Sequence, residues 1–221
     1  MIEYNKIDTV FKRDTEGSKK LLIGQFRDET VDFLQDLAWE WTEKIDGTNI
    51  RVRWDGHKVE FGGRTDKVQI PAPLMNKLIE LFGGETNAQI FEQAFGDREV
   101  ILFGEGYGAK IQNGGDYTLD GKSVNFILFD VMICGNYQSR ITVHAVAKMF
   151  NIGHVPVVGR GRLDEAIRFI MSHPKSKLMP YTHDMEGLVC RPVVELQDRC
   201  GHRVIVKIKW KDFKHFAEGS V

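Results

Sequence analysis

Cysteine is scarce in this chain of 221 residues, with only Cys134, Cys190 and Cys200 present. The number is odd, and no two of them have the paired spacing of zinc ligands. This argues against both a disulfide framework and a zinc site. It predicts reduced thiols in a cytoplasmic protein.

Long apolar runs are also missing. No segment is long enough to span a bilayer or to form the core of a signal peptide, so a membrane is not an expected partner. Neither sign of charge dominates, because 30 basic residues nearly balance 31 acidic ones. A nucleic-acid site must therefore be a local patch and not a broadly basic surface.

Repeats, low-complexity tracts and linkers are absent, and the length predicts a single domain over residues 1–221. There is no P-loop. Gly104, Gly106 and Gly108 do not form a dinucleotide-binding fingerprint, because no helix start follows them. We expect these glycines to let the backbone approach a ligand or turn sharply.

Hydrophobic periodicity predicts helices and strands that do not alternate regularly. We expect helices over residues 30–38, 71–82, 86–95 and 142–150 and from residue 164, with Thr30 and Asp164 as N-caps. We expect strands over residues 49–54, 58–61, 100–104, 125–133, 187–191 and 204–210. This order predicts an α+β fold with mixed, mainly antiparallel sheets and flanking helices.

The strand expected over residues 204–210 carries Lys207 and Lys209 on one face, because side chains alternate along a strand. Val204, Val206, Ile208 and Trp210 would face the core. Two ammonium groups about 7 Å apart can bind a phosphate. Taken alone, the pattern favours an amphipathic edge strand with solvated lysines.

A lysine at position 44 opens the segment Lys-Ile-Asp-Gly-Thr-Asn of residues 44–49, between an aromatic run and an alternating strand. By itself this segment is typical of a strand end followed by a turn. It resembles the nucleophile motif Lys-x-Asp-Gly of covalent nucleotidyltransferases. In that superfamily the lysine attacks the α-phosphate of ATP or GTP and becomes a lysyl-nucleotide.

Further segments resemble the later motifs of that superfamily and follow in the same order, so that the resemblance covers residues 39–213. They are Gly-Arg-Thr at 63–65, the strand ending at Glu105, Phe-Asp at 129–130, Glu-Gly at 186–187 and Lys-Ile-Lys at 207–209. The residues around Lys44 look most like the RNA ligases, particularly the RNA ligase 2 branch. The resemblance implies a nucleotidyltransferase core, described as an ATP-grasp-like ligase core.

The resemblance also implies roles around the reacting phosphate. Lys44 is the expected nucleophile, while Lys207 and Lys209 would contact the α-phosphate. Glu186 is the expected ligand of Mg²⁺ or Mn²⁺, although a turn carboxylate beside a glycine remains the alternative. Asp46 would orient Lys44 or a metal-bound water, or it would cap its own backbone in a turn.

Other family positions imply contacts to the rest of the nucleotide. Phe129 would stack on the purine, unless it belongs to a continuous core strand. Glu105 and Arg64 match contacts to the ribose hydroxyls. Glu43 matches a position near the adenine amino group, with plain exposure as the alternative. Asn49 matches a position tied to the reacting phosphate and the terminal hydroxyl.

We therefore expect an ATP-dependent RNA ligase that joins 5′-phosphate and 3′-hydroxyl ends through lysyl-AMP, in RNA repair. The alternatives are a DNA ligase, a GTP-using guanylyltransferase and a non-catalytic nucleic-acid-binding module. Asp46 leaves the choice of polymer open, because the most similar RNA ligases often have histidine there. The expected substrate is RNA with nicked or single-stranded ends, and the expected protein is a monomer.

The chain ends about a dozen residues after Lys209, so no C-terminal oligonucleotide-binding or helical domain is expected. A separate partner protein could then grip the RNA ends. Phosphate contacts from the core would come from Arg51, Arg53, Lys110 and Arg191, unless these are ordinary surface residues.

Overall fold

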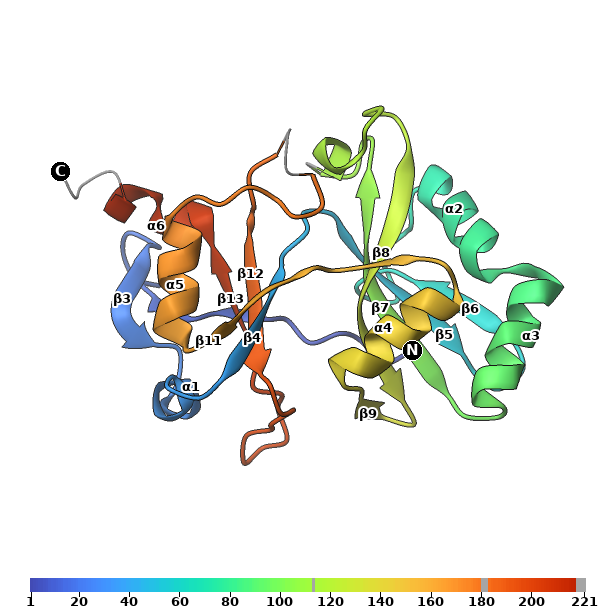
Figure 1. Ribbon diagram of the computed structural model, residues 1–221, viewed down its shortest axis with the longest axis horizontal. Helices are drawn as coiled ribbons and strands as arrows, with labels where there is room; N and C mark the ends of the chain where they lie inside the picture. The colour runs from blue at the N-terminus through green and yellow to red at the C-terminus, as the bar shows by residue number, and fades with distance from the viewer. Residues whose placement is uncertain (113, 180–182, 218–221) are drawn as a thin grey trace. The chain divides into compact units, whose positions relative to one another are not determined.

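The structure is a computed structural model that describes residues 1–112, 114–179 and 183–217. It divides into two compact units (Figure 1). Unit 1 contains Met1–Asn5 and Ile45–Val155, and unit 2 contains Lys6–Lys44 and Pro156–Val221. The segment of residues 44–49 therefore begins in unit 2 and continues in unit 1.

Unit 1 is built on a mainly antiparallel sheet with the strand order β10-β8-β7-β5-β6, and β9 pairs with β8. Only the pairing of β10 with β8 is parallel among the described residues. The strands are β5 (Thr48–Trp54), β6 (Val59–Gly62), β7 (Val100–Gly108), β8 (Val124–Ile133), β9 (Asn136–Tyr137) and β10 (Gly153–His154).

Three helices cover one face of this sheet: α2 (Ala72–Phe82), α3 (Gly84–Phe95) and α4 (Arg140–Met149). Their buried side chains share one apolar cluster with alternate residues of β5, including Ile50, Val52 and Trp54. Since strand side chains alternate, Asn49, Arg51 and Arg53 lie on the opposite face. A short 3₁₀ helix, η1 (Gly114–Tyr117), follows β7.

Gly104 and Gly106 of β7 serve close packing, whereas Gly108 has a φ of +123°, in agreement with the expected sharp turn. A Cβ at Gly104 would lie 2.2 Å from the ring of Phe126, and one at Gly106 would lie 2.4 Å from Leu74. These distances are far shorter than a van der Waals contact. The glycines therefore allow β7 to continue to Gly108, beyond its predicted end at residue 104.

Unit 2 contains a second sheet with the strand order β1-β13-β12-β4-β11. Its strands are β1 (Asp8–Thr9), β4 (Trp39–Glu43), β11 (Val157–Gly161), β12 (Gly187–Pro192) and β13 (Val206–Lys209). β1 runs parallel to β13, and the other neighbours are antiparallel. A separate hairpin joins β2 (Phe11–Arg13) to β3 (Leu21–Phe26).

The helices of unit 2 are α1 (Glu29–Leu34), α5 (Leu163–Met171) and α6 (Trp210–Ala217). Val31, Leu163 and Phe213 connect them to an apolar cluster that includes residues of β4, β12 and β13. In the described part of the chain, no helix has the length and apolarity that crossing a membrane requires.

The predicted α+β class with mixed, mainly antiparallel sheets is confirmed, but several boundaries were wrong. Asp28, and not Thr30, caps α1, because its side chain accepts a hydrogen bond from the N–H of Val31. Asp164 lies in the first turn of α5, after the N-cap Arg162. Trp210 begins α6 and does not continue the preceding strand.

Candidate active site

The ends of three neighbouring strands bring Lys44, Glu186 and Lys209 together in unit 2. β12 lies between β4 and β13 and is antiparallel to both, so its start adjoins their ends. Gly187 pairs with Lys209, and its carbonyl accepts a hydrogen bond of 2.9 Å from the N–H of Lys44. Glu186 therefore directly precedes the central strand, with a lysine on each side.

The carboxylate of Glu186 bridges these two lysines. Its Oε2 lies 2.7 Å from Nζ of Lys44, and its Oε1 lies 2.6 Å from Nζ of Lys209. The three side chains are only 16%, 22% and 19% exposed for Glu186, Lys44 and Lys209. Such charge-assisted hydrogen bonds are strongest where water is partly excluded. Glu186 is thus a member of an ionic cluster, and the alternative of a plain turn carboxylate is wrong.

The charges around Glu186 keep it ionised. Burial raises the pKa of its carboxyl, but the positive charge of Lys44 and the hydrogen bonds from Lys209 and Lys44 outweigh this effect. The pKa therefore lies below its ordinary value. At neutral pH the carboxylate can bind cations, including the two ammonium groups that contact it.

Lys207 adds a third cation on the same face of β13 as Lys209. Burial lowers the pKa of Lys207, and the neighbouring charges of Lys209, Lys44 and Lys6 lower it further against the opposing effect of Asp8. Among the described residues, its ammonium has no ion-pair partner. Three lysines against one carboxylate leave two excess positive charges, which favours an anion such as phosphate.

β13 is not an edge strand, because it lies between β1 and β12. Val206 and Ile208 are buried, while Lys207 and Lys209 are partly exposed. The predicted alternation is therefore confirmed for these four residues. The alternative of an edge strand with solvated lysines is wrong, because a neighbouring strand flanks each side.

Glu43 is buried at the end of β4, with 1% of its surface exposed. Its Oε2 accepts a hydrogen bond of 2.7 Å from the backbone N–H of Lys177, and its Oε1 is buried without a partner among the described residues. The alternative of plain exposure is therefore wrong. A buried acceptor that lacks a donor is costly, so it points to a ligand that donates a hydrogen bond.

Asn49 and Glu105 form a cross-strand pair on the face of the unit 1 sheet that the helices do not cover. Directly paired residues place their side chains next to each other. Both side chains are partly exposed, yet Oδ1 of Asn49 is buried without a hydrogen-bond partner among the described residues. This pair therefore offers polar groups on a single surface.

Phe129 occupies an irregular position in β8. Phe103 pairs with Asp130 and Gly104 pairs with Leu128, so Phe129 is the extra residue of a β-bulge. Leu128 belongs to the core cluster, whereas Phe129 lies on the opposite face and is partly exposed between two buried neighbours. The alternative of a continuous core strand is therefore wrong at this position.

Tyr4, which no sequence pattern indicated, supports the Phe129 segment. Its ring packs edge-on against Phe129 with centroids 5.0 Å apart, and its hydroxyl donates a hydrogen bond of 2.6 Å to Oδ2 of the buried Asp130. No local signal could have shown this, because the partners are 126 residues apart.

The remaining candidates have less defined surroundings. Arg64 is exposed after β6, and Asp46 is partly exposed in the link between β4 and β5. A pocket of about 410 Å³ lies in unit 1, with Phe61, Asp66 and Ile70 among its lining residues. None of the predicted site residues lines this pocket.

Two of the arginines predicted to contact RNA phosphates have structural partners instead. Arg51 is fully buried and bonds to the carbonyl of Gly63 and to Asp66. Arg191 is 7% exposed and pairs with Glu195. Neither is the surface cation that the prediction requires. Lys110 is exposed, whereas Arg53 is partly exposed and pairs with two glutamates.

Comparison with protein families gives the same answer as the motifs. The family described as RNA ligase matches residues 37–209, which is well over half of the chain. The chain belongs to the RNA ligase family. The predicted family is therefore confirmed, while the RNA ligase 2 branch stays a prediction.

Solved structures of an RNA ligase from Naegleria gruberi share the fold of this RNA ligase family member. One point mutant with ATP and Mn gives a TM-score of 0.64 at 20% identity and covers 98% of this chain and 59% of that one. Another mutant with ATP and Mn gives a TM-score of 0.63 at 16% sequence identity. That match covers 99% of this chain and 63% of the Naegleria chain. The structure of the ligase with PPi gives a TM-score of 0.63 at 18% sequence identity. That match covers 97% of this chain and 64% of the Naegleria chain.

The chain thus spans about three fifths of the length of these solved proteins. Comparison with curated protein sequences gave no match.

Proposed function

We propose that this chain is an ATP-dependent RNA ligase that takes AMP onto Lys44. The observation that carries the proposal is the bridge of Lys44 and Lys209 by Glu186, with Lys207 beside it. A nucleophilic lysine, a carboxylate and two further lysines are the groups that nucleotidyl transfer requires. Family membership and the similar structures with ATP, Mn and PPi support this assignment.

In this proposal Lys207 and Lys209 hold the α-phosphate, and Glu186 holds Mg²⁺ or Mn²⁺. The residues fit these groups, because the lysines provide excess positive charge and hard divalent cations prefer carboxylate oxygens. The bound cation would neutralise negative charge on the phosphate oxygens. Asp46 orients Lys44, and Asn49 contacts the reacting phosphate and the terminal hydroxyl.

Lys44 must lose a proton before it can attack phosphorus. In the structure its ammonium contacts the carboxylate of Glu186, so Lys44 must leave this contact before it attacks. Once released from Glu186, Lys44 lies beside Lys207 and Lys209. In this proposal Glu186 holds Lys44 through the ion pair until Lys44 is released for the attack.

In this proposal the buried Glu43 would give a preference for ATP over GTP. Its Oε1 lacks a donor among the described residues, and the adenine amino group can supply one. Guanine has an acceptor oxygen at the equivalent ring position, which would face this acceptor unfavourably. Phe129 would stack on the base, while Glu105 and Arg64 would contact the ribose.

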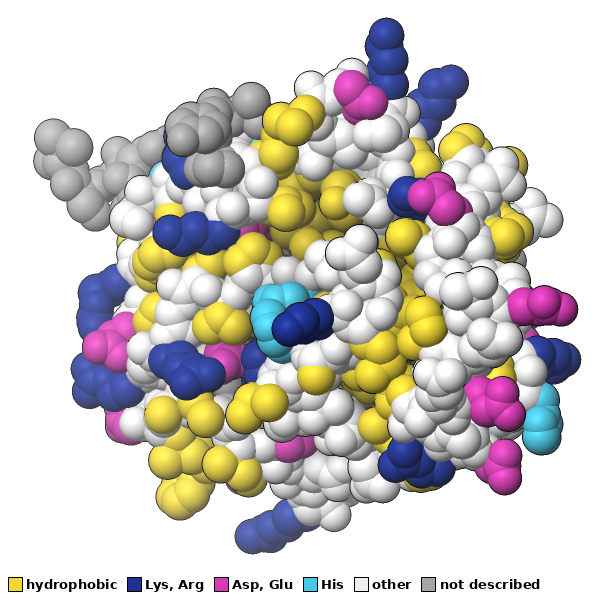
Figure 2. Space-filling model, turned by 45° about the vertical axis from the view of Figure 1, so that its right-hand side comes forward, with side chains coloured by type: hydrophobic (Ala, Val, Ile, Leu, Met, Phe, Trp, Pro, Cys, Tyr) yellow, Lys and Arg dark blue, Asp and Glu magenta, His cyan; other side chains and the backbone are white. Residues whose placement is uncertain are grey.

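Joining would then pass AMP to a 5′-phosphate end, and a 3′-hydroxyl would displace it. The RNA site must be local, because basic and acidic side chains are interspersed over the described residues on the face in Figure 2. We expect a cytoplasmic, monomeric RNA-repair enzyme acting on nicked or single-stranded ends. A partner protein could supply additional grip on the ends.

Denaturing electrophoresis after incubation with α-labelled ATP or GTP tests this proposal. We expect a covalent AMP adduct that is acid-labile and alkali-stable, as a phosphoramidate is. Lys44→Ala should abolish it, whereas Lys12→Ala, at an exposed lysine of unit 2, should not.

Each other outcome identifies a different function. Stronger labelling by GTP would indicate a guanylyltransferase. Sealing of DNA but not RNA 3′-hydroxyl ends would indicate a DNA ligase. An unlabelled, folded wild-type protein would indicate a binding module and would overturn the proposal.

A further inference from the structure

A hairpin that follows β12 in unit 2 has a rigid stem. The N–H of Val204 donates a hydrogen bond of 2.9 Å to the carbonyl of Leu196. Gln197 and Arg203 form an isolated antiparallel β-bridge. The guanidinium of Arg203 binds both carboxylate oxygens of Glu195, which fixes the base of the stem. These contacts therefore fix the two ends of the segment that forms the hairpin tip.

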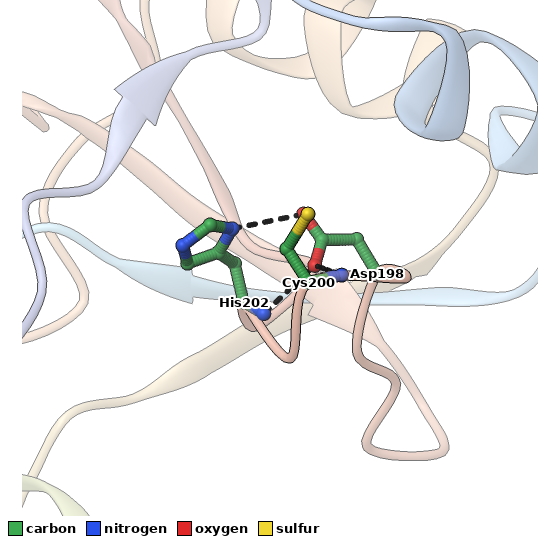
Figure 3. Close-up of side chains that lie close together, drawn as sticks. All are labelled: Asp198, Cys200 and His202. Atoms are coloured by element: carbon green, nitrogen blue, oxygen red, sulfur yellow. Dashed lines mark hydrogen bonds and ion pairs between the residues drawn. The ribbon is translucent and has the colours of Figure 1, made fainter.

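The tip folds around the carboxylate of Asp198. Its Oδ1 accepts hydrogen bonds of 2.8 Å from the N–H groups of both Cys200 and His202. The N–H of Asp198 donates to the carbonyl of His202 at 2.8 Å, and Gly201, with φ of +79°, reverses the chain. Asp198, Cys200 and His202 thereby gather at one turn (Figure 3).

The ligand atoms of these three side chains all lie within 4.8 Å of one another. Oδ2 of Asp198 is 3.1 Å from Nδ1 of His202. Tetrahedral coordination with metal–ligand bonds of about 2.0–2.3 Å needs ligand atoms roughly 3.3–3.7 Å apart. The ligand atoms must therefore rearrange by only about 1 Å, which the exposed side chains of Cys200 and His202 can do.

We propose that Asp198, Cys200 and His202 bind one borderline transition-metal ion of the Zn²⁺ class, with water in the fourth position. A carboxylate, a thiolate and a neutral imidazole balance its double positive charge. The sulfur and nitrogen donors distinguish this site from Glu186, whose oxygens suit Mg²⁺ or Mn²⁺. Binding replaces the proton on the Cys200 thiol, which passes to solvent as the metal–sulfur bond forms.

A further observation agrees with this assignment. No other group of three candidate metal-binding side chains lies this close together in the described ranges. The cysteine spacing argued against a zinc site, because the ligands of this cluster alternate with other residues and include only one cysteine.

Titration of the metal-stripped protein with Co²⁺ tests the proposal. A thiolate ligand gives Co²⁺ an intense charge-transfer absorption that oxygen ligands, such as those at Glu186, do not give. We expect this band at one Co²⁺ per chain, and we expect Zn²⁺ but not Mg²⁺ to remove it. Cys200→Ser should abolish the band, while Cys134→Ser, at the other exposed cysteine, should leave it unchanged.

His202→Gln and Asp198→Asn should each weaken Co²⁺ binding at least roughly 10-fold. Zn²⁺ should also slow alkylation of Cys200 but not of Cys134 by a thiol reagent. Circular dichroism of each variant verifies the fold. Absence of the band, or its persistence in a folded Cys200→Ser variant, would overturn the proposal whether or not the protein ligates RNA.

Discussion

Lys44 and Lys209 lie on opposite sides of a single carboxylate, with their ammonium nitrogens 2.7 and 2.6 Å from the two oxygens of Glu186. The proposed nucleophile and a proposed phosphate-binding group therefore share one counter-ion. A cation that occupied both oxygens of Glu186 would therefore free both lysines. This coupling allows binding of the nucleotide and activation of the nucleophile to occur together.

Glu186→Gln removes the shared negative charge while preserving the size of the side chain. We expect the rate of Lys44 labelling to fall by roughly 10²-fold or more, because the divalent cation and the lysines lose their common partner. Single-turnover labelling with Mg²⁺ and with Mn²⁺ measures this, alongside thermal melts. Wild-type rates in both metals would show that Glu186 has no part in the chemistry.

Lys207→Met should increase stability and reduce activity. The lowered pKa means that the folded protein binds fewer protons at Lys207 than the unfolded chain, so the charged lysine disfavours the fold below that pKa. The methionine variant should melt at a higher temperature at neutral pH, and this gain should shrink as the pH rises. Labelling should fall by roughly 10²-fold, as for loss of a charge at a reacting phosphate.

Lys207→Arg provides the matched control, because arginine keeps its charge at alkaline pH. In the wild type, nucleotide affinity should fall as the pH rises through the lowered pKa of Lys207. The arginine variant should retain its affinity to higher pH. An identical alkaline limb in both proteins would assign that limb to another group.

Glu43→Gln should relax the preference for ATP. The glutamine oxygen can still accept from the N–H of Lys177, while its amide N–H₂ can donate to the oxygen of guanine. We expect the ratio of ATP to GTP labelling to fall about 10-fold or more, on the scale of one unpaired buried group. Glu29→Gln, at an exposed residue of α1, should leave the ratio unchanged. An unaltered ratio in Glu43→Gln would remove Glu43 from base recognition.

The variants Phe129→Ala and Tyr4→Phe test two different roles. The first tests stacking of Phe129 on the base, and the second tests the contribution of the Tyr4 hydroxyl to stability. Loss of the Phe129 ring should weaken ATP binding by roughly 1–3 kcal/mol if it stacks on the base, by analogy with aromatic stacking of bases. Tyr4→Phe keeps the packing but removes the hydroxyl donor to Asp130, which should cost about 1–3 kcal/mol of stability. Calorimetric titration with ATP and thermal melts distinguish the two. Unchanged ATP affinity in Phe129→Ala would exclude the stacking role.

Arg51 and Arg53 offer a matched pair on one strand. Arg51→Met leaves the carbonyl of Gly63 without its donor, so we expect a loss of about 1–3 kcal/mol of stability. Arg53 pairs with partly exposed glutamates, so Arg53→Met should cost less than about 1 kcal/mol. Chemical denaturation compares them. Equal losses would show that burial does not distinguish the two arginines.

The sequence was sufficient for features that depend on local pattern. Alternation identified the faces of β13, and helical periodicity identified α2 to within a residue of its start. The ordered motifs identified Lys44, Glu186 and Lys209 as candidates. Their contact follows from strand pairing, because antiparallel neighbours bring a strand start beside two strand ends.

Other features depend on contacts between distant segments and had no local signal. Arg51 looks like a surface cation in an alternating strand, but the chain at residues 63–66 covers it. Phe129 follows three apolar residues, and its partial exposure depends on which face of the unit 1 sheet the helices leave uncovered. Glu43 is charged, and plain exposure was the alternative to its family role, yet its buried carboxylate accepts a hydrogen bond from the N–H of Lys177.

The origin of the Lys44–Glu186–Lys209 cluster in three strand ends has a consequence for refolding. Lys44 and Glu186 are 142 residues apart, so their meeting requires one of the most distant pairings in the chain. Such pairings form late, because closing a long loop is entropically costly. A refolding chain should therefore accept labelled AMP only after β4, β12 and β13 have assembled. The rate at which the radioactive adduct appears during refolding would then report the rate at which that sheet is completed.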